Sequence, residues 1–283
     1  MRNIGFQLHR KSSLNCGQYQ LNLGTKTYIM GILNVTPDSF SDGGKFIDLE
    51  KAVHHAKKMV EEGADIIDIG GESTRPGAKE IDAKQELSRV LPVVKRLVKE
   101  IDVPLSVDTY KAEVAEKVLE AGAHMINDIW GMQRDCHMTS VIHKFDVPII
   151  IMHNQKGTEY KKDLLEEICE FFKKSIDIAI KSGVKRENII LDPGIGFGKT
   201  PEQNMLVLSR LGELNDLGYP LLLGTSRKSM IGKILDVCTK ERIEGTIATT
   251  VMGIIQGIDI VRVHDVKENS KAAKVTDAIV RRI

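Results

Sequence analysis

Four polar side chains stand where short apolar runs of this 283-residue chain end. Asp108, Asn127 and Asp192 each close a run rich in Val, Ile and Leu, and Lys228 follows another such run. At the end of a buried strand, an isolated carboxylate or amide is costly unless it has hydrogen-bond partners. A carboxylate accepts two bonds side by side, an amide donates and accepts, and an ammonium donates. Together the four could read the edge of an aminopyrimidinone ring; alternatively, each is a helix cap or a paired polar group of the core.

A second group of side chains suits an anion. Arg262 and His264 are two residues apart in the last apolar run, so their side chains point to the same side of a strand. With Asn34, at the end of the first run, they could hold a phosphate or diphosphate. In the alternative interpretation, Arg262 pairs with a carboxylate inside the fold and His264 caps the following helix.

The segment DPGIGFGKT at 192–200 contains glycines that suggest a nucleotide site, but the spacing excludes it. A P-loop needs a glycine where Pro193 stands, and a dinucleotide fingerprint needs one where Lys199 stands. We interpret the glycines as letting the backbone run close beneath a flat ligand; alternatively, the loop simply needs positive φ angles. His153 has no partner motif and is interpreted as structural, and Trp130 as a packing residue with at most a minor ligand contact.

The elements that position these side chains follow a regular alternation. Eight apolar runs, each followed by a helix-like stretch, predict strands at 28–33, 65–69, 104–107, 124–127, 148–152, 188–191, 220–223 and 259–263. The intervening stretches 52–60 and 87–97 show apolar residues at the 3.6-residue period of a helix. Such alternation predicts a parallel sheet with right-handed crossovers, and eight units predict an α/β fold, the (β/α)8 TIM barrel. In that fold the polar strand ends meet on one rim, where active sites lie.

Residues 1–25 do not follow the alternation. Alternating apolar and polar residues at 6–8 and 19–23, around a Cys16-Gly17 turn signal, predict a β-hairpin that plugs the bottom of the barrel. We therefore divide the chain into a hairpin extension, 1–25, and a barrel domain, 26–283. The long polar connections 34–48 and 72–82 leave the expected catalytic rim, and we interpret both as lids.

Composition excludes several classes of function. Lysine plus arginine (40) nearly balances aspartate plus glutamate (39), which argues against a surface for nucleic acid or anionic membranes. The four cysteines are widely spaced and without metal-binding patterns, so we expect reduced packing residues. Neither a signal peptide nor a membrane-spanning apolar stretch is found, and we expect a cytoplasmic protein.

From about residue 28 to the C-terminus, the chain closely resembles the dihydropteroate synthase family. The motifs that carry the resemblance occur in the family's order: MGILNVTPDSFSDGG at 30–44, GGESTRPG at 70–77, SVDT at 106–109, IND at 126–128, DPGIGFGKT at 192–200, GTSRKS at 224–229 and VRVH at 261–264. The resemblance implies condensation of 6-hydroxymethyl-7,8-dihydropterin diphosphate with 4-aminobenzoate, giving dihydropteroate and diphosphate on the way to folate. It also implies a homodimer packed through the later helices and competition by sulfonamides for the aminobenzoate site.

The resemblance also implies roles for individual residues. The pterin would be held by Asp108, Asn127, Met152, Asp192 and Lys228. The diphosphate would be held by Asn34, Thr74, Arg262 and His264, with Mg2+ bound through Asn34 and the diphosphate oxygens. The aminobenzoate site would be lined by Phe40, Thr74, Pro76, Phe197, Lys228 and Ser229. Those expected to take part in catalysis are Asp108, Lys228, Arg262 and His264.

Two alternative functions remain open at this point. A methyltetrahydrofolate-binding methyltransferase domain shares the barrel and the pterin-binding carboxylates, but it would not need the SFSDGG and SRKS motifs. A catalytically silent paralogue that binds pterin would not require Asn34, Arg262 and His264. For the synthase we expect an SN1-like displacement, in which Asp108 stabilises a pterin-conjugated cation after the diphosphate leaves.

Overall fold

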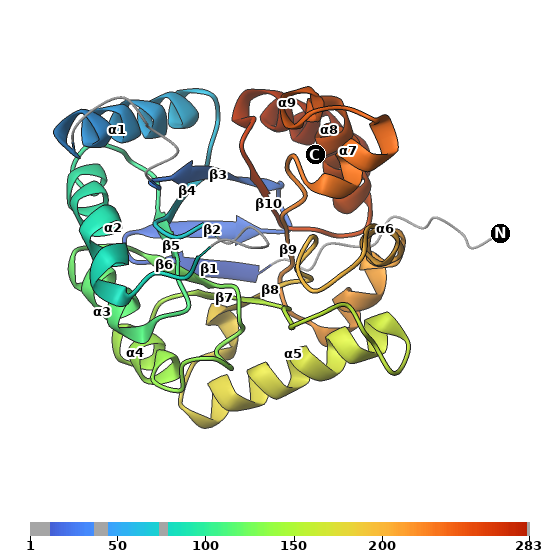
Figure 1. Cartoon of the computed structure of the whole chain (residues 1–283), viewed down its shortest axis with the longest axis horizontal. Coiled ribbons are helices and arrows are strands. Elements are labelled where there is room, and N and C mark those ends of the chain that lie inside the picture. Colours follow the sequence, from blue (N-terminus) through green and yellow to red (C-terminus); the bar gives the residue numbers. More distant parts are fainter. Residues whose placement is uncertain (1–11, 37–44, 74–78, 282–283) are drawn as a thin grey trace.

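Eight parallel strands surround the central axis of the computed structural model, which describes residues 12–36, 45–73 and 79–281 (Figure 1). The strands are β3 (Tyr28–Asn34), β4 (Ile66–Gly70), β5 (Leu105–Asp108), β6 (Met125–Asp128), β7 (Ile149–Met152), β8 (Ile189–Asp192), β9 (Leu222–Leu223) and β10 (Ile260–Val263). Their order in the sheet is β8-β7-β6-β5-β4-β3-β10-β9, and a parallel bridge between Leu191 and Leu221 joins its two edges. The predicted (β/α)8 barrel is therefore confirmed.

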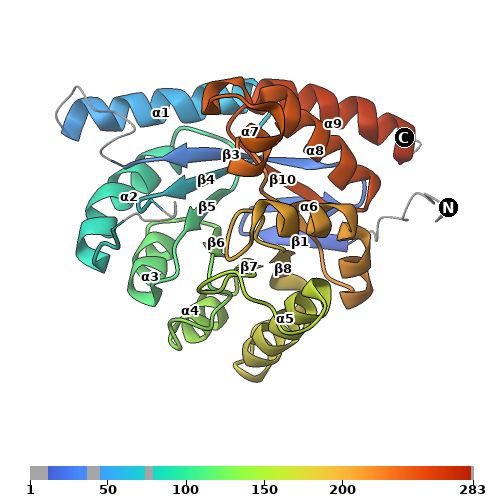
Figure 2. The same cartoon turned by 45° about the vertical axis from the view of Figure 1, so that its right-hand side comes forward.

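Helices form the outer layer around these strands (Figure 2). They are α1 (Lys45–Glu61), α2 (Ala83–Leu97), α3 (Ala112–Glu120), α4 (Met138–Phe145), α5 (Leu164–Lys181), α6 (Pro201–Ser209), α7 (Ser229–Leu235), α8 (Ile243–Ile255) and α9 (Val266–Val280). Short 3-10 helices lie at Arg186–Asn188, Leu211–Leu217 and Thr239–Glu241. In α2 the predicted period buries Val90, Val94 and Leu97 against the barrel, and Asp82 caps the helix by accepting from Gln85 N at 2.7 Å.

An antiparallel hairpin, β1 (Ser12–Cys16) and β2 (Tyr19–Leu23), precedes the barrel. Gly17 at the turn has φ +62°, a conformation that glycine adopts without strain. The buried hairpin residues Leu14, Cys16, Leu21 and Leu23 share one apolar cluster with barrel residues that include Met30, Ile66, Met125, Ile150, Ile190, Leu222 and Ile260. This packing confirms the predicted plug, although its first strand starts at Ser12 and the run 6–8 lies outside the described residues.

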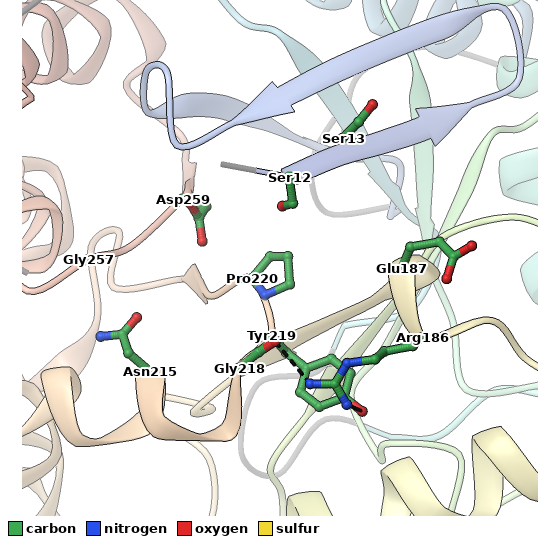
Figure 3. A pocket seen from close by; sticks show the side chains of 10 residues that line it. All are labelled: Ser12, Ser13, Arg186, Glu187, Asn215, Gly218, Tyr219, Pro220, Gly257 and Asp259. Atoms are coloured by element: carbon green, nitrogen blue, oxygen red, sulfur yellow. Dashed lines mark hydrogen bonds between the residues drawn. The ribbon is translucent and has the colours of Figure 1, made fainter. Parts of the chain in front are cut away.

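A hollow of about 530 Å³ lies at the end of the barrel where the strands begin (Figure 3). Ser12 and Asp259 line it together with Arg186, whose guanidinium carbon lies 4.0 Å from the Tyr219 ring centroid. Arg186 also donates to the Tyr219 hydroxyl at 2.6 Å. None of the predicted site residues lines this hollow, so we assign no function to it.

The strand ladder brings the polar strand ends to one level. Asn34 pairs with Gly70, Gly70 with Asp108, and Asp108 with Asn127. Farther along the sheet, Met152 pairs with Asp192. Several strands thus extend one residue beyond the predicted end, because the backbone of a polar residue can still join the ladder.

The predicted lids cannot be compared in full. Residues 37–44 of the first and 74–78 of the second lie outside the described residues. Of the predicted aminobenzoate and diphosphate residues, Phe40, Thr74 and Pro76 lie in these two segments. Among the helices that are described, none is long and apolar enough to span a membrane.

Candidate functional site

Arg262 lies at the centre of the polar rim and forms two ion pairs across the barrel. Its Nε donates to Asp68 Oδ2 at 2.6 Å, and its Nη2 donates to Asp108 Oδ2 at 2.8 Å. Burial alone would lower the pKa of Arg262, but the charges of the two carboxylates raise it above its ordinary value. The pairing is the alternative that we gave for Arg262, so in the free protein this side chain contacts carboxylates. Its predicted contact with an anion remains a prediction.

Asp68, which the sequence analysis did not select, links this pair to a third strand. It is fully buried in β4, and its Oδ2 also accepts from Asn127 Nδ2 in β6 at 3.2 Å. Since β4, β6 and β10 are not neighbours in the sheet, these contacts run through the barrel interior. One signal could have identified Asp68: it is a carboxylate inside the otherwise apolar run Ile66–Ile69.

Three oxygen atoms in this network are buried and have no hydrogen-bond partner among the residues that the structure describes: Asp68 Oδ1, Asp108 Oδ1 and Asn127 Oδ1. Buried polar atoms in proteins are nearly always paired, and leaving one unpaired costs free energy. All three are acceptors, since the Asn127 amide turns its NH2 group to the Asp68 carboxylate. The interior of the rim therefore suits a ligand with several N–H donors.

Asp192 and Lys228 are the other two of the four residues predicted to bind the edge of an aminopyrimidinone ring. Asp192 Oδ1 accepts from Gly194 N at 2.7 Å. Burial raises the pKa of Asp192, while this hydrogen bond and the Lys228 ammonium act in the opposite direction. Burial and the nearby Arg262 lower the pKa of Lys228 to about 8, so that its ammonium form still predominates at pH 7. The structure thus brings a carboxylate and an ammonium to the same rim as Asp108 and Asn127.

The glycines between Asp192 and Lys199 serve the loop's own conformation. Gly194, Gly196 and Gly198 all have positive φ angles, +68°, +83° and +55°. A Cβ on Gly196 would lie 2.9 Å from Lys228 Cδ, so this backbone runs close beside the lysine. The positive φ angles of the alternative interpretation are therefore present, and the passage of this backbone beneath a flat ligand stays a prediction.

Apolar side chains form one wall of the site. Met152, with Tyr110 and Ile129, makes a small buried cluster against which Trp130 and Phe197 pack. The Lys228 ammonium lies 4.1 Å from the centroid of the Phe197 ring. The predicted residues Met152, Phe197 and Lys228 are therefore neighbours, and the exposed Ser229 follows at the start of α7.

The two remaining anion-site residues flank Arg262. Asn34 is half-buried at the end of β3, next to β10 in the sheet. His264 Nδ1 lies 3.0 Å from Ser226 Oγ, and His264 does not cap α9. Burial and Arg262 lower the pKa of His264 to about 4, so its ring is neutral at pH 7. In the free protein His264 can therefore offer a hydrogen bond to an anion but not a positive charge.

A second charged group, missed by the sequence analysis, fixes the base of the second predicted lid. Lys111 forms ion pairs with Glu72, and with the buried Glu86 at 2.5 Å. Arg89 donates to the carbonyl of Gly71 at 2.8 Å. These contacts hold residues 71 and 72, directly before the segment that contains Thr74 and Pro76.

Comparison with known proteins gives one consistent family. The family model described as pterin binding enzyme matches residues 30–264. A dihydropteroate synthase from Clostridium beijerinckii is 58% identical over 270 residues, covering 95% of this chain and 100% of that protein. A dihydropteroate synthase from Bacillus subtilis is 54% identical over 262 residues, covering 93% of this chain and 92% of that protein.

Solved structures show the same similarity. A dihydropteroate synthase from Clostridium difficile, determined in the presence of pteroic acid, has 63% identity and a TM-score of 0.90, covering 92% of this chain and 98% of that one. The enzyme from Xanthomonas albilineans with 4-aminobenzoic acid has 39% identity and a TM-score of 0.91, covering 95% of this chain and 98% of that one. A sulfonamide complex of the Yersinia pestis enzyme has 42% identity and a TM-score of 0.89, covering 96% and 100%.

Proposed function

The chain belongs to the dihydropteroate synthase family of pterin-binding enzymes, and on this premise we propose that it joins 6-hydroxymethyl-7,8-dihydropterin diphosphate to 4-aminobenzoate. The observation that carries the proposal is a set of three buried acceptors beside Arg262 that have no partner in the described part of the chain: Asp68 Oδ1, Asp108 Oδ1 and Asn127 Oδ1. A pterin presents ring N–H groups and an exocyclic amine along one edge, and these are the donors that such oxygens lack. Asp192 and Lys228 would complete its recognition, and Met152 would pack against the ring.

Arg262, His264 and Asn34 would receive the diphosphate. Oxygen ligands suit Mg2+, which commonly binds one or two protein oxygens together with substrate phosphates and water. The Asn34 amide oxygen fits this use, because its neighbour in the ladder, Gly70, has no side chain beside it. A Cβ at Gly70 would lie 3.4 Å from that oxygen. When bound, Mg2+ would supply positive charge to the leaving diphosphate. Thr74 is part of the same proposal but lies outside the described residues.

The arrangement supports departure of the diphosphate before attack by the amine. The Arg262 guanidinium can stabilise charge on the leaving oxygens, and His264 can donate a hydrogen bond to them. The methylene left behind would be a cation conjugated with the pterin ring, and the Asp108 carboxylate would stabilise that charge. Phe197, Lys228 and Ser229, with Phe40 and Pro76, would position 4-aminobenzoate, a weak nucleophile, for attack. The comparisons do not favour the methyltransferase or the silent paralogue.

The direct test is incubation of the purified protein with the pterin diphosphate, 4-aminobenzoate and Mg2+. We expect equal amounts of dihydropteroate and diphosphate, loss of activity with a magnesium chelator, and inhibition by a sulfonamide that more aminobenzoate relieves. If no diphosphate is released, the synthase proposal is wrong. Tight pterin binding without release would instead favour the silent paralogue.

Asp192→Asn should weaken pterin binding with little effect on folding. The asparagine oxygen can still accept from Gly194 N, but the charge-assisted bond to the ligand is lost, which costs about 1.5–3 kcal/mol. Calorimetric titration with a pterin that lacks phosphates measures this directly. Asp163→Asn, an N-cap substitution at the start of α5, provides a control for loss of an aspartate charge. Unchanged pterin affinity in Asp192→Asn would remove Asp192 from the pterin site.

The homodimer that we propose would pack through α6, α7 and α8. These helices border an apolar groove of about 360 Å³, and Met205, Ile234 and Met252 on its lining are 39%, 61% and 50% exposed. A second copy of the chain is the occupant that we propose, because large apolar patches on soluble proteins mark interaction sites. Ile234→Glu should shift sedimentation toward the monomer. Val275→Glu should not, because Val275 is 63% exposed on α9, outside the groove. A monomeric wild-type protein would contradict the proposal.

A further inference from the structure

Lys199 is a buried lysine for which neither the fold nor the proposed reaction has so far required a role. It closes the glycine-containing loop after β8, and the residue is only 8% exposed. Its Nζ lies 2.8 Å from His153 Nδ1, 3.1 Å from the Gly194 carbonyl and 3.2 Å from the Phe197 carbonyl. An ammonium has three N–H groups, and these three acceptors can use all of them.

The His153 ring is the third partner of Lys199. Burial, reinforced by the Lys199 charge, lowers the pKa of His153 to about 2, so the ring is neutral near pH 7. In the tautomer with the proton on Nε2, its Nδ1 accepts from the Lys199 ammonium. His153 directly follows β7, and its backbone N donates to the Asp192 carbonyl at 2.9 Å. Lys199 therefore ties the loop to the rigid end of a neighbouring strand.

Other bonds hold the same loop at different residues. Gly196 N donates to Asn204 Oδ1 at 2.7 Å, and the Tyr160 hydroxyl donates to the Gly198 carbonyl at 2.8 Å. Lys199 is the side chain that bonds the carbonyl of Phe197. The Phe197 ring in turn faces the Lys228 ammonium at 4.1 Å. The Phe197 backbone N–H also donates to the Gly194 carbonyl at 3.1 Å, and Lys199 bonds that same carbonyl, so both carbonyls that fix the backbone around Phe197 contact Lys199.

Stability alone is a weak reason for a lysine at this position. Burial lowers the pKa of Lys199 to about 7, because its charged form is unfavourable away from water, so the ammonium and the neutral amine are both populated at pH 7. Replacing a buried ion pair by apolar side chains of similar volume is often neutral or stabilising, so a buried charge is weak evidence for a role in stability. A group that costs free energy yet orients a residue of the site is better explained by its effect on that site.

We propose that Lys199 is a positioning residue that holds Phe197 in place for 4-aminobenzoate, acting through the loop carbonyls and without touching either substrate. This inference rests on the proposed function, because it takes Phe197 as part of the aminobenzoate site. It predicts a selective effect, because the hydrogen bonds of Lys199 go to His153 and to the carbonyls of its own loop rather than to the pterin residues at the strand ends. Of those pterin residues, Asp192 feels the Lys199 charge, but its hydrogen bond from Gly194 and the charges of Lys228 and Arg262 lower its pKa more.

The test measures KM for both substrates in Lys199→Met. We expect KM for 4-aminobenzoate to rise about tenfold, as loss of charge-assisted bonds allows, while KM for the pterin diphosphate stays within about twofold. Hydrogen exchange at residues 194–198 should become faster in the variant, whereas exchange in β8 should not. Lys199→Gln can donate two of the three hydrogen bonds, so its KM for 4-aminobenzoate should lie between those of the wild type and Lys199→Met. It replaces the methionine variant in the test if that variant does not fold.

Tyr160→Phe is the matched control, because it removes a bond to the same loop at Gly198 and leaves Phe197 held by Lys199. Both of its KM values should equal those of the wild type. Equal rises in both KM values of Lys199→Met, or none, would overturn the proposal. A wild-type protein that releases no diphosphate is a separate result, since it contradicts the proposed function before any variant is compared.

Discussion

Arg262→Ala is expected to lower kcat for dihydropteroate formation by about 10²–10³-fold, the size of effect seen when one donor to a developing oxyanion is removed. Among the described residues proposed to bind the diphosphate, Arg262 carries the positive charge, because Asn34 is uncharged and His264 is neutral at pH 7. The substitution also leaves Asp68 and Asp108 without their positive partner. Breaking a buried pair in this way costs about 3–5 kcal/mol, so stability should fall as well.

Two measurements separate these effects. Steady-state kinetics gives kcat and KM for the pterin diphosphate, and urea unfolding gives the free energy of unfolding. Binding of a pterin without phosphates should change much less than binding of the diphosphate ester. Arg186→Ala, which removes an arginine at the opposite end of the barrel, should leave kcat unchanged. A folded Arg262→Ala protein with wild-type kcat would exclude Arg262 from diphosphate departure.

The sequence predicted which residues reach the rim but not how they pair there. Hydrophobic periodicity identified the strands, and the order of the strands around a closed barrel follows from their alternation with helices. Periodicity carries no information on contacts between distant strands: Arg262 and Asp68 are 194 residues apart, and no local pattern joins them. The sequence offered pairing with a carboxylate as an alternative for Arg262, but only the arrangement of the strands around one axis shows that the partners are Asp68 and Asp108.

Lys199 illustrates the same limit within a single motif. Spacing argues against a P-loop in DPGIGFGKT because Pro193 stands where a glycine is needed, and against a dinucleotide fingerprint because Lys199 does. The same spacing could not show that the Lys199 side chain turns back to the carbonyls of its own loop and to His153. That contact depends on the positive φ angles of Gly194, Gly196 and Gly198, which the composition permits but does not require.

Asp108→Asn provides the sharpest test of the order of bond breaking and bond making. Asparagine can keep the hydrogen bond from Arg262, since its oxygen can accept where Asp108 Oδ2 now accepts at 2.8 Å. What it loses is the negative charge beside the pterin ring. Burial raises the pKa of this carboxyl, with Arg262 opposing the shift, so in the native protein the charged form depends on that pair.

If the diphosphate leaves before the amine attacks, loss of this charge destabilises the cation and its transition state. We expect kcat to fall by about 10²–10³-fold, with a smaller change in KM for the pterin diphosphate. Asp192→Asn should show the opposite pattern, a change mainly in affinity.

Isotope scrambling tests the intermediate itself. The substrate is labelled with 18O at the oxygen that joins the pterin methylene to the first phosphorus, and aminobenzoate is left out. Reversible departure would let the diphosphate rotate and return, which moves the label to a non-bridging oxygen of the same phosphorus. We expect scrambling in the wild type and its loss in Asp108→Asn. Since an attack concerted with departure cannot scramble the label without the amine, scrambling in the wild type would exclude a concerted attack. A pterin trapped covalently on the protein during turnover would contradict the SN1-like mechanism.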